Sequence, residues 1–323
     1  MPDTYTSQFS GEEIDSALRA AQMISGASTP AELRKKLEIR GDTIPVSATD
    51  PTPVSEALTA SGGGVNPNLL DNWFFGNPVN QRGQTEYTAV GYTVDRWKLD
   101  IDIGTVAVES DGIVLDGGST GCTLYELQEP ALLSMLEGQI LTFSAMYTIL
   151  SQTGSPGGFG TTVPGSYVAR CIFGGSVGVK NVASGSAVMP TNLQSVSWFY
   201  IPAGCKIKIH AVKVELGDTQ TLAHKENGAW VLNEIPDFGE QLRRCQRYYL
   251  KLEQNTVGVG SGIENIGGAI VYPIYFPTTM RTEPAVTVSN SDLVVDYTHS
   301  TGCRIKVQVA GWRDFDLTAS ADL

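Results

Sequence analysis

The chain has 323 residues, with 22 lysine and arginine side chains against 34 aspartate and glutamate side chains, and its formal net charge is −12. Its length is sufficient for two or three domains that each bury a core of their own. The acidic balance argues against a nucleic-acid-binding protein, which needs a basic surface, and against adsorption to anionic membranes. No apolar run approaches the roughly 18 residues that a membrane-spanning helix needs, so we expect no membrane insertion.

The composition favours a β-rich protein. There are 35 glycines and 16 prolines, and serine and threonine are frequent between short apolar runs. The five cysteines are odd in number and no two have metal-ligand spacing, so we interpret them as free thiols of a protein made in a reducing cytoplasm. The three histidines are scattered, and we expect neither a metal site nor a cofactor. Residues 1–20 carry five charges and no apolar stretch, which is unlike a signal peptide.

Residues 1–61 contain three short helix signals. A capping box begins at Ser10, and Thr-Pro pairs place Pro30 and Pro53 at the first position of two further helices. Each helix is too short to be stable alone, so it must pack on a neighbour. The sequence therefore predicts an N-terminal helical attachment segment, followed by a glycine hinge at 62–64.

Residues 62–218 have the pattern of a jelly-roll β-sandwich. The stretch Gln139–Leu150 alternates apolar and polar residues, and residues 110–112 read Ser-Asp-Gly, a hairpin turn signal. The alternation after Ile207 shifts by one residue near His210 and Ala211, which predicts a β-bulge. Short strands at this spacing are typical of a jelly roll.

Residues 219–252 are predicted to form a connector and one amphipathic linking helix. The helix is expected over 237–252, with Asp237 as its N-cap. Its apolar stripe consists of Phe238, Leu242, Cys245, Tyr249 and Leu252. A stripe with this 4-3 spacing usually packs on a core, and it could also be the seam of a short coiled coil.

Residues 253–323 are predicted to form a smaller C-terminal β domain. Alternating or β-branched runs bounded by turn residues mark its strands. The strand candidates are Ala269–Phe276, Ala285–Ser289, Leu293–Tyr297, Arg304–Ala310 and Phe315–Leu317.

Several segments resemble tail proteins of bacteriophages and prophages. They are Ser10–Asp15, Leu70–Trp73, Asn77–Gly83, Tyr92–Trp97, Val212–Gly217, Phe238–Leu242, Cys245–Tyr249, Phe276–Arg281 and Pro284–Thr287. The resemblance implies a tail fibre or receptor-binding (tail-tip) protein of the virion tail, made in the cytoplasm of the host bacterium. It implies a homotrimer with a carbohydrate-binding-like jelly roll, whose N-terminal segment binds other tail or baseplate proteins and whose ligand is a bacterial surface glycan. The connector 219–235 departs from the family, in which the strand leads to the helix more directly.

Motifs for catalysis are weak. Residues 117–121 and 174–178 match Gly-x-Ser-x-Gly, but neither precedes a helical pattern, as a nucleophile elbow requires. Asp100 and Asp102 share a strand face and could form a carboxylate pair or bind Ca²⁺, although a solvated strand face is the commoner role. We therefore expect no enzyme activity.

Exposed aromatic side chains are the better functional signal, because sugar rings stack on them. Trp73 and Trp97 lie in segments expected to be core, whereas Trp312 has polar neighbours near the chain end. We predict Tyr297, Trp312 and Arg313 as ligand-binding residues on loops and strand ends of the C-terminal domain.

Two other functions remain open from the sequence. One is a tailspike-type glycan hydrolase, which would require two facing carboxylates. The other is a purely structural baseplate or tail-decoration protein, which would have no exposed aromatic or polar pocket.

Overall fold

The computed structural model describes residues 66–100, 104–259, 270–307 and 311–322. The chain divides into two units, 1–65 and 66–323, and all described residues belong to the second. The helices predicted within 1–61 lie outside the described residues.

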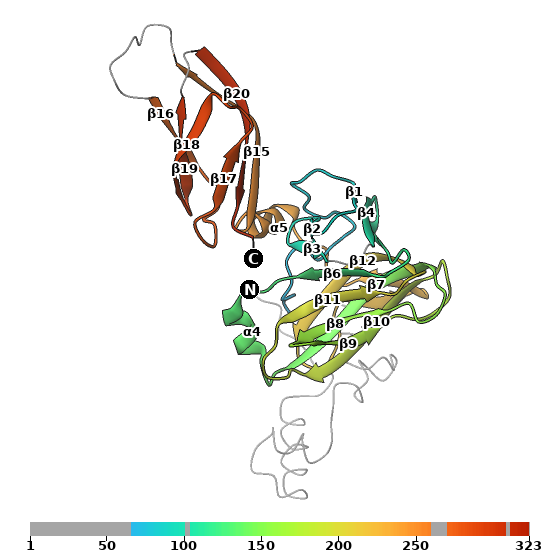
Figure 1. Cartoon of the computed structure of the whole chain (residues 1–323). Coiled ribbons are helices and arrows are strands. Elements are labelled where there is room, and N and C mark those ends of the chain that lie inside the picture. Colours follow the sequence, from blue (N-terminus) through green and yellow to red (C-terminus); the bar gives the residue numbers. More distant parts are fainter. Residues whose placement is uncertain (1–65, 101–103, 260–269, 308–310, 323) are drawn as a thin grey trace, which may run out of the picture. The chain divides into compact units, whose positions relative to one another are not determined.

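Residues 66–218 fold into a β-sandwich of two six-stranded antiparallel sheets (Figure 1). The first sheet has the order β1 (Glu86–Tyr87), β4 (Thr105–Glu109), β5 (Gly112–Asp116), β12 (Lys206–Leu216), β7 (Ile140–Ser151) and β10 (Lys180–Val188). The second has the order β2 (Gly91–Tyr92), β3 (Trp97–Leu99), β6 (Cys122–Glu126), β11 (Ser195–Ile201), β8 (Gly158–Val163) and β9 (Ser166–Ile172). Helix α4 (Pro130–Leu136) connects β6 to β7. The predicted jelly-roll-like sandwich is confirmed.

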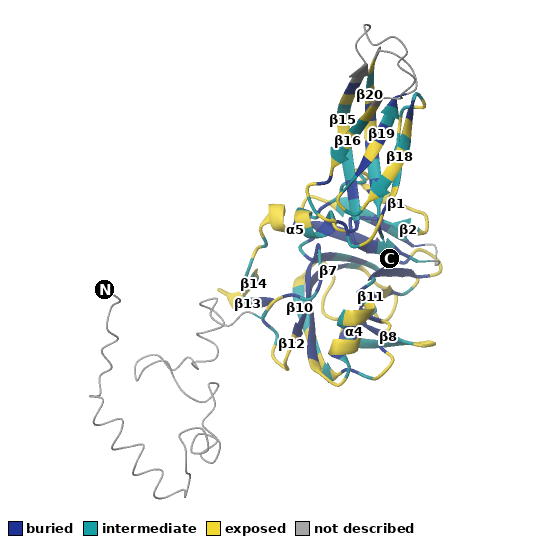
Figure 2. Ribbon diagram, turned by 90° about the vertical axis from the view of Figure 1, so that its left-hand side faces the viewer, coloured by how far each residue is buried: buried dark blue, intermediate teal, exposed yellow. Residues whose placement is uncertain are grey.

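The core lies between the two sheets. Buried positions, dark blue in Figure 2, follow β7, and the Phe159 and Phe199 rings stack with centroids 4.6 Å apart. Trp97 is fully buried beside Phe199. The predicted hairpin is present, with Glu109 paired to Gly112, and so is the predicted bulge, between Ile209 and Ala211 on β12.

The connector forms a hairpin that covers the outer face of the first sheet. Its strands are β13 (Ala223–Glu226) and β14 (Ala229–Leu232). Lys213 points away from the core, yet its side chain is 0% exposed and its Nζ lies 3.0 Å from Glu234 Oε1. The backbone N–H of Thr221 donates to Glu215 Oε1 at 2.7 Å. Because a buried charge must be paired, these contacts fix the connector on the sheet.

The linking helix is shorter than predicted. Helix α5 spans Phe238–Cys245, and Asp237 caps it by accepting the Glu240 N–H at 2.8 Å, as expected. The extension to residue 252 is wrong, because the chain enters strand β15 (Tyr249–Val259). Pairing of β15 with another strand overrides the local helical spacing, a common outcome when tertiary contacts compete with propensity. Tyr249 and Leu252 belong to β15, so the predicted two-heptad stripe is not present on one helix.

The C-terminal domain consists of two three-stranded antiparallel sheets around one core. One sheet has the order β15, β20 (Gly311–Ser320) and β17 (Ala285–Val288), and the other has the order β16 (Ile270–Tyr275), β19 (Gly302–Val307) and β18 (Leu293–His299). Ile305 and Leu317, one from each sheet, are fully buried in the shared core. The five predicted strands are present, and β15 is the one that the sequence interpretation missed.

Arg96 lies at the contact between the jelly roll and the segment after α5. Its Nη2 is 3.0 Å from Glu126 Oε1, and its Nε is 3.3 Å from Asp71 Oδ2. The guanidinium carbon lies 3.5 Å from the centre of the Tyr248 ring. Arg96 and Glu126 are both almost completely buried, so each depends on the other for charge compensation.

Arg82 makes the equivalent contact with the start of β15. Its guanidinium lies 3.9 Å from the centre of the Tyr249 ring and bridges Asp95 at 3.0 Å and Asp322 at 2.7 Å. The neighbouring Gln81 donates to the Tyr249 carbonyl at 2.7 Å. The segments Asn77–Gly83, Tyr92–Trp97 and Cys245–Tyr249, which carried part of the phage-tail resemblance, therefore meet at one junction.

All five cysteines are buried and free, as the sequence predicted. Among the described residues, no helix is both long and apolar enough to cross a membrane.

We expect Arg96→Met to lower the free energy of unfolding by about 3–5 kcal/mol, because it leaves the buried Glu126 carboxylate without its cation. Urea unfolding of the full chain measures this. Arg243→Gln is the matched control, because this arginine also pairs with a glutamate but is 57% exposed. The control should leave the unfolding midpoint nearly unchanged. Equal effects of the two substitutions would show that the junction is not held by the Arg96 pair.

A second prediction concerns pH. Burial raises the pKa of Asp95 to about 6, although the hydrogen bond from Gln81 and the charge of Arg82 both lower it. The folded chain therefore holds this proton more tightly than the unfolded chain, and the resulting stability is lost as pH rises through about 6. Relative to Asp95→Asn, the unmodified chain should gain about 1 kcal/mol between about pH 7 and pH 5. Parallel pH profiles of the two chains would contradict this assignment.

Candidate functional site

The outer face of the β16–β19–β18 sheet carries the strongest site candidate. On β19, Cys303, Ile305 and Val307 point into the core, so Gly302, Arg304 and Lys306 point outward. The strand register then builds two cross-strand rows on this face. One row is Tyr297–Arg304–Pro273 and the other is His299–Gly302–Tyr275.

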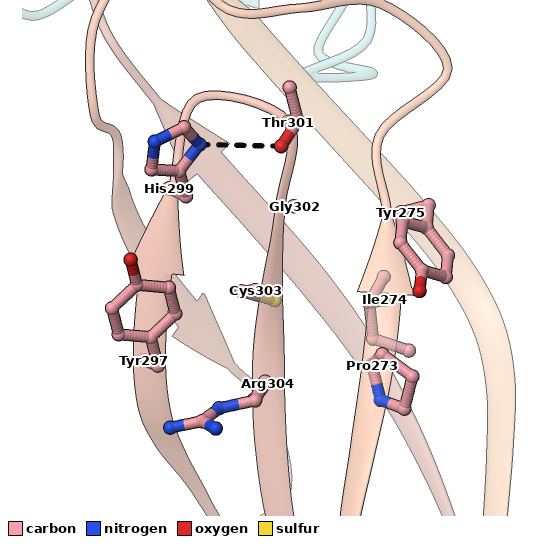
Figure 3. A pocket seen from close by; sticks show the side chains of 9 residues that line it. All are labelled: Pro273, Ile274, Tyr275, Tyr297, His299, Thr301, Gly302, Cys303 and Arg304. Atoms are coloured by element: carbon pink, nitrogen blue, oxygen red, sulfur yellow. Dashed lines mark hydrogen bonds between the residues drawn. The ribbon is translucent and has the colours of Figure 1, made fainter.

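These rows enclose an open hollow of about 300 Å³ (Figure 3). The side chains that line it are those of Pro273, Ile274, Tyr275, Tyr297, His299, Thr301, Gly302, Cys303 and Arg304. Tyr275 is 80% exposed and Tyr297 is 52% exposed, on opposite sides of β19. Two strand spacings and an offset of two residues along the strands put these tyrosine positions about 12 Å apart. Exposed aromatic side chains around a hollow are a common feature of binding sites.

A β-bulge on β18 shapes the polar side of the hollow. The register shifts between Val295 and Tyr297, so Asp296 and Tyr297 both lie opposite Arg304. Asp296 Oδ2 is 2.9 Å from Arg304 Nη2, and the guanidinium carbon is 5.0 Å from the centre of the Tyr297 ring. The bulge thus fixes the guanidinium from two directions.

The floor of the hollow requires glycine at position 302. A Cβ on Gly302 would lie 2.3 Å from the Ile274 carbonyl oxygen, because β16 approaches β19 closely here. The turn before it is held by the Phe276 N–H, which donates to the Thr301 carbonyl at 3.0 Å, and by the Met280 N–H, which donates to the Ser300 carbonyl at 2.8 Å. Backbone contacts around Gly302 and the preceding turn therefore shape the floor of the hollow.

Acidic and thiolate groups are scarce in the lining of the hollow. Burial raises the pKa of the Cys303 thiol to about 11, so the thiolate nucleophile is scarce at neutral pH. The nine lining residues include no aspartate or glutamate. Across the described residues, no group of three histidine, cysteine, aspartate or glutamate side chains could hold a metal ion. The arrangement is suited to binding through aromatic stacking and guanidinium hydrogen bonds.

The structure does not bring the three predicted ligand residues together. Tyr297 lines the hollow, but Trp312 and Arg313 belong to β20 in the other sheet. Trp312 is 75% exposed and lies opposite Gly258. Arg313 Nε donates to Asp292 Oδ2 at 2.6 Å, an ion pair within the domain.

The sequence interpretation missed Tyr275 and Arg304. The alternation of Arg304–Val309 indicated that Arg304 faces away from the core, but nothing local placed it beside Tyr297. Only the pairing of β16 and β18 with β19 assembles these side chains.

A second, more polar hollow of about 480 Å³ lies on the β15–β20–β17 sheet. Asp314 and Asp316 line it from alternate positions of β20. Asp314 Oδ1 accepts the Thr256 hydroxyl at 2.7 Å, and Asp316 Oδ1 accepts the Gln254 N–H at 3.0 Å. The sequence interpretation offered Asp100 and Asp102 as the carboxylate pair instead, and Asp102 lies outside the described residues.

The remaining sequence candidates take structural roles. Trp73 and Trp97 are buried in the jelly-roll core, as predicted. The two Gly-x-Ser-x-Gly segments lie between strands, 117–121 between β5 and β6 and 174–178 between β9 and β10, and neither leads into a helix.

No protein-family model matches the chain, and neither does any curated protein. Two solved structures show a distant likeness. The CBM22-1–GH10 modules of Clostridium thermocellum endo-1,4-β-D-xylanase 10B, complexed with xylohexaose, are 11% identical over 47% of this chain, with a TM-score of 0.34. The CBM22-2 xylan-binding domain of Paenibacillus barcinonensis Xyn10C is 10% identical over 38% of this chain and 92% of that domain, with a TM-score of 0.31. The chain spans 29% of the length of the xylanase structure. Likeness at this level carries no argument about a ligand.

Proposed function

We propose that this chain is a receptor-binding protein of a bacteriophage tail, which attaches the virion to glycans on the bacterial surface. The observation that carries the binding function is the hollow between Tyr275 and Tyr297, with Arg304 between them. The apolar face of a sugar ring can stack on a tyrosine, and a guanidinium can donate several hydrogen bonds to sugar oxygens. The backbone around Gly302 holds these groups in place, which limits the ordering cost of binding.

The tail assignment is supported by the resemblance of segments spread along the chain. In this proposal, residues 1–61 bind other tail or baseplate proteins, and the C-terminal domain meets the host. The jelly roll is the body between these two functions. The buried junction at Arg82 and Arg96 connects it to the binding domain.

Binding without cleavage is the proposed mode of action. Glycoside hydrolysis uses two carboxyl groups on either side of the scissile bond, and the lining of the tyrosine hollow has none. Asp314 and Asp316 in the polar hollow are the specific observation that favours the hydrolase alternative.

We expect Tyr275→Ala and Tyr297→Ala each to weaken glycan binding about tenfold, equivalent to ~1.4 kcal/mol, through loss of a stacking surface. The full chain is first screened against a panel of bacterial surface polysaccharides, and affinities for the bound ones are then measured by calorimetry. Trp312→Ala is the control, because Trp312 is also an exposed aromatic residue but lies on the other sheet.

A loss caused by Trp312→Ala and by neither tyrosine variant would move the site to β20. Binding to no polysaccharide would favour the structural baseplate or decoration protein. New reducing ends released from the bound polysaccharide, and abolished by Asp314→Asn or Asp316→Asn, would establish the hydrolase instead.

The proposal includes a homotrimer. The hollow is open and shallow, so a single site should bind weakly, and several sites on one particle raise the effective concentration. Only 17% of residues are charged, which suits a chain with large contacts between copies. Mass measurement of the full chain in solution should give about three times 34.6 kDa. A clean monomer at micromolar concentration would exclude this part of the proposal.

A further inference from the structure

We infer that the saccharide bound between Tyr275 and Tyr297 is anionic, with a negative group held by Arg304. This inference rests on the proposed glycan-binding function and specifies its ligand class. It starts from Arg304, the cation in the lining of the hollow, whose ion-pair partner Asp296 lies outside that lining.

Arg304 is prepared to receive an anion. Asp296 Oδ2 lies 2.9 Å from Nη2, and the Tyr297 ring lies on the face of the guanidinium. Among the described residues, no acceptor bonds to Nε or Nη1 of Arg304. Nη2 carries two hydrogens, so the one that Asp296 does not accept can act with Nε or with Nη1 to bind a carboxylate or a phosphate through two parallel hydrogen bonds. Such charge-assisted bonds are shorter and stronger than bonds to a neutral hydroxyl.

The surroundings of Arg304 support the same ligand class. Lys306, the next outward position of β19, has no ion pair among the described residues and adds a second positive charge to the face. His299 lies across Gly302 from Tyr275. Two acidic side chains lie near this face, and each already has a partner. Asp296 pairs with Arg304, and Glu283 accepts a hydrogen bond from the hydroxyl of Thr298 on β18.

This local arrangement contrasts with the net charge of −12. A uniformly acidic surface would repel an anionic glycan, and attraction at short range must come from specific cations. Arg304 is therefore the residue that we assign to ligand selection, while the two tyrosines provide stacking for any sugar.

The test compares three probes on the full chain by calorimetry. They are a uronic-acid oligosaccharide, the same oligosaccharide with its carboxyl groups reduced to alcohols, and a sugar phosphate. We expect the uronate to bind at least about tenfold more tightly than its reduced form. Arg304→Gln should remove this preference, and Arg304→Lys should retain part of it, because lysine keeps the charge but not the planar fork.

Two variants separate the possible outcomes. Lys306→Gln removes the same charge two positions along β19, outside the hollow lining, and should keep most of the preference. Equal losses from Arg304→Gln and Lys306→Gln would overturn the assignment to Arg304. Tyr275→Ala should weaken the acidic and reduced probes by the same factor, because Tyr275 lies across β19 from the Tyr297 ring that contacts the guanidinium.

If the unmodified chain binds both oligosaccharides equally and Tyr297→Ala abolishes both, the anion inference fails and the glycan-binding function stands. Tighter binding of the sugar phosphate than of the uronate would support an anionic ligand and identify phosphate as its charged group. Binding of none of the three probes would overturn the inference together with its premise.

Discussion

Two arginine–tyrosine stacks connect the jelly roll to the start of the C-terminal domain. Arg82 lies over Tyr249 and Arg96 lies over Tyr248, at the point where the polypeptide leaves the jelly roll for the C-terminal domain. Both arginines are also paired with buried carboxylates, Arg82 with Asp95 and Arg96 with Glu126. Loss of the tyrosine contacts would therefore leave these buried charges less well compensated. The segments Asn77–Gly83, Tyr92–Trp97 and Cys245–Tyr249 are far apart in the sequence and all contribute to this junction.

The contacts of the junction lie at the start of β15, so the outer faces of the sheets of the C-terminal domain remain exposed to solvent. Apart from the register shifts in β15 and β18, alternation places the core on one face of each sheet and solvent on the other. On the β16–β19–β18 face, the bulge at Asp296 adds one side chain beyond what alternation supplies, and it orients Arg304 beside Tyr297. A binding site on paired strands is held more rigidly than one on loops. This rigidity compensates for the open shape of the hollow on the β16–β19–β18 sheet.

The sequence predicted most elements but not the site. Alternation identified β7 and the C-terminal strands, and Asp237 correctly marked the start of α5. Tyr249 and Leu252 continued the helical spacing by coincidence, so β15 was mistaken for helix; its pairing partner β20 begins more than fifty residues later, beyond any local signal. For the same reason, the sequence did not indicate that Tyr297 lies near Tyr275 and Arg304, because their proximity depends on strand register. The sequence left Trp312 open between an exposed and a core position, and it did not indicate the sheet on which the exposed side chain lies.

In the proposed function, the glycan covers the face between Tyr275 and Tyr297. Hydroxyl-radical footprinting of the full chain, with and without the polysaccharide it binds, measures this at single residues. Tyr275, Tyr297 and Trp312, the exposed aromatic residues in the described part of the C-terminal domain, serve as reporters in one experiment. The account predicts that the polysaccharide protects Tyr275 and Tyr297 from oxidation and leaves Trp312 unchanged. Protection of Trp312, or of exposed Tyr200 on the jelly roll, with both C-terminal tyrosines still reactive, would contradict it.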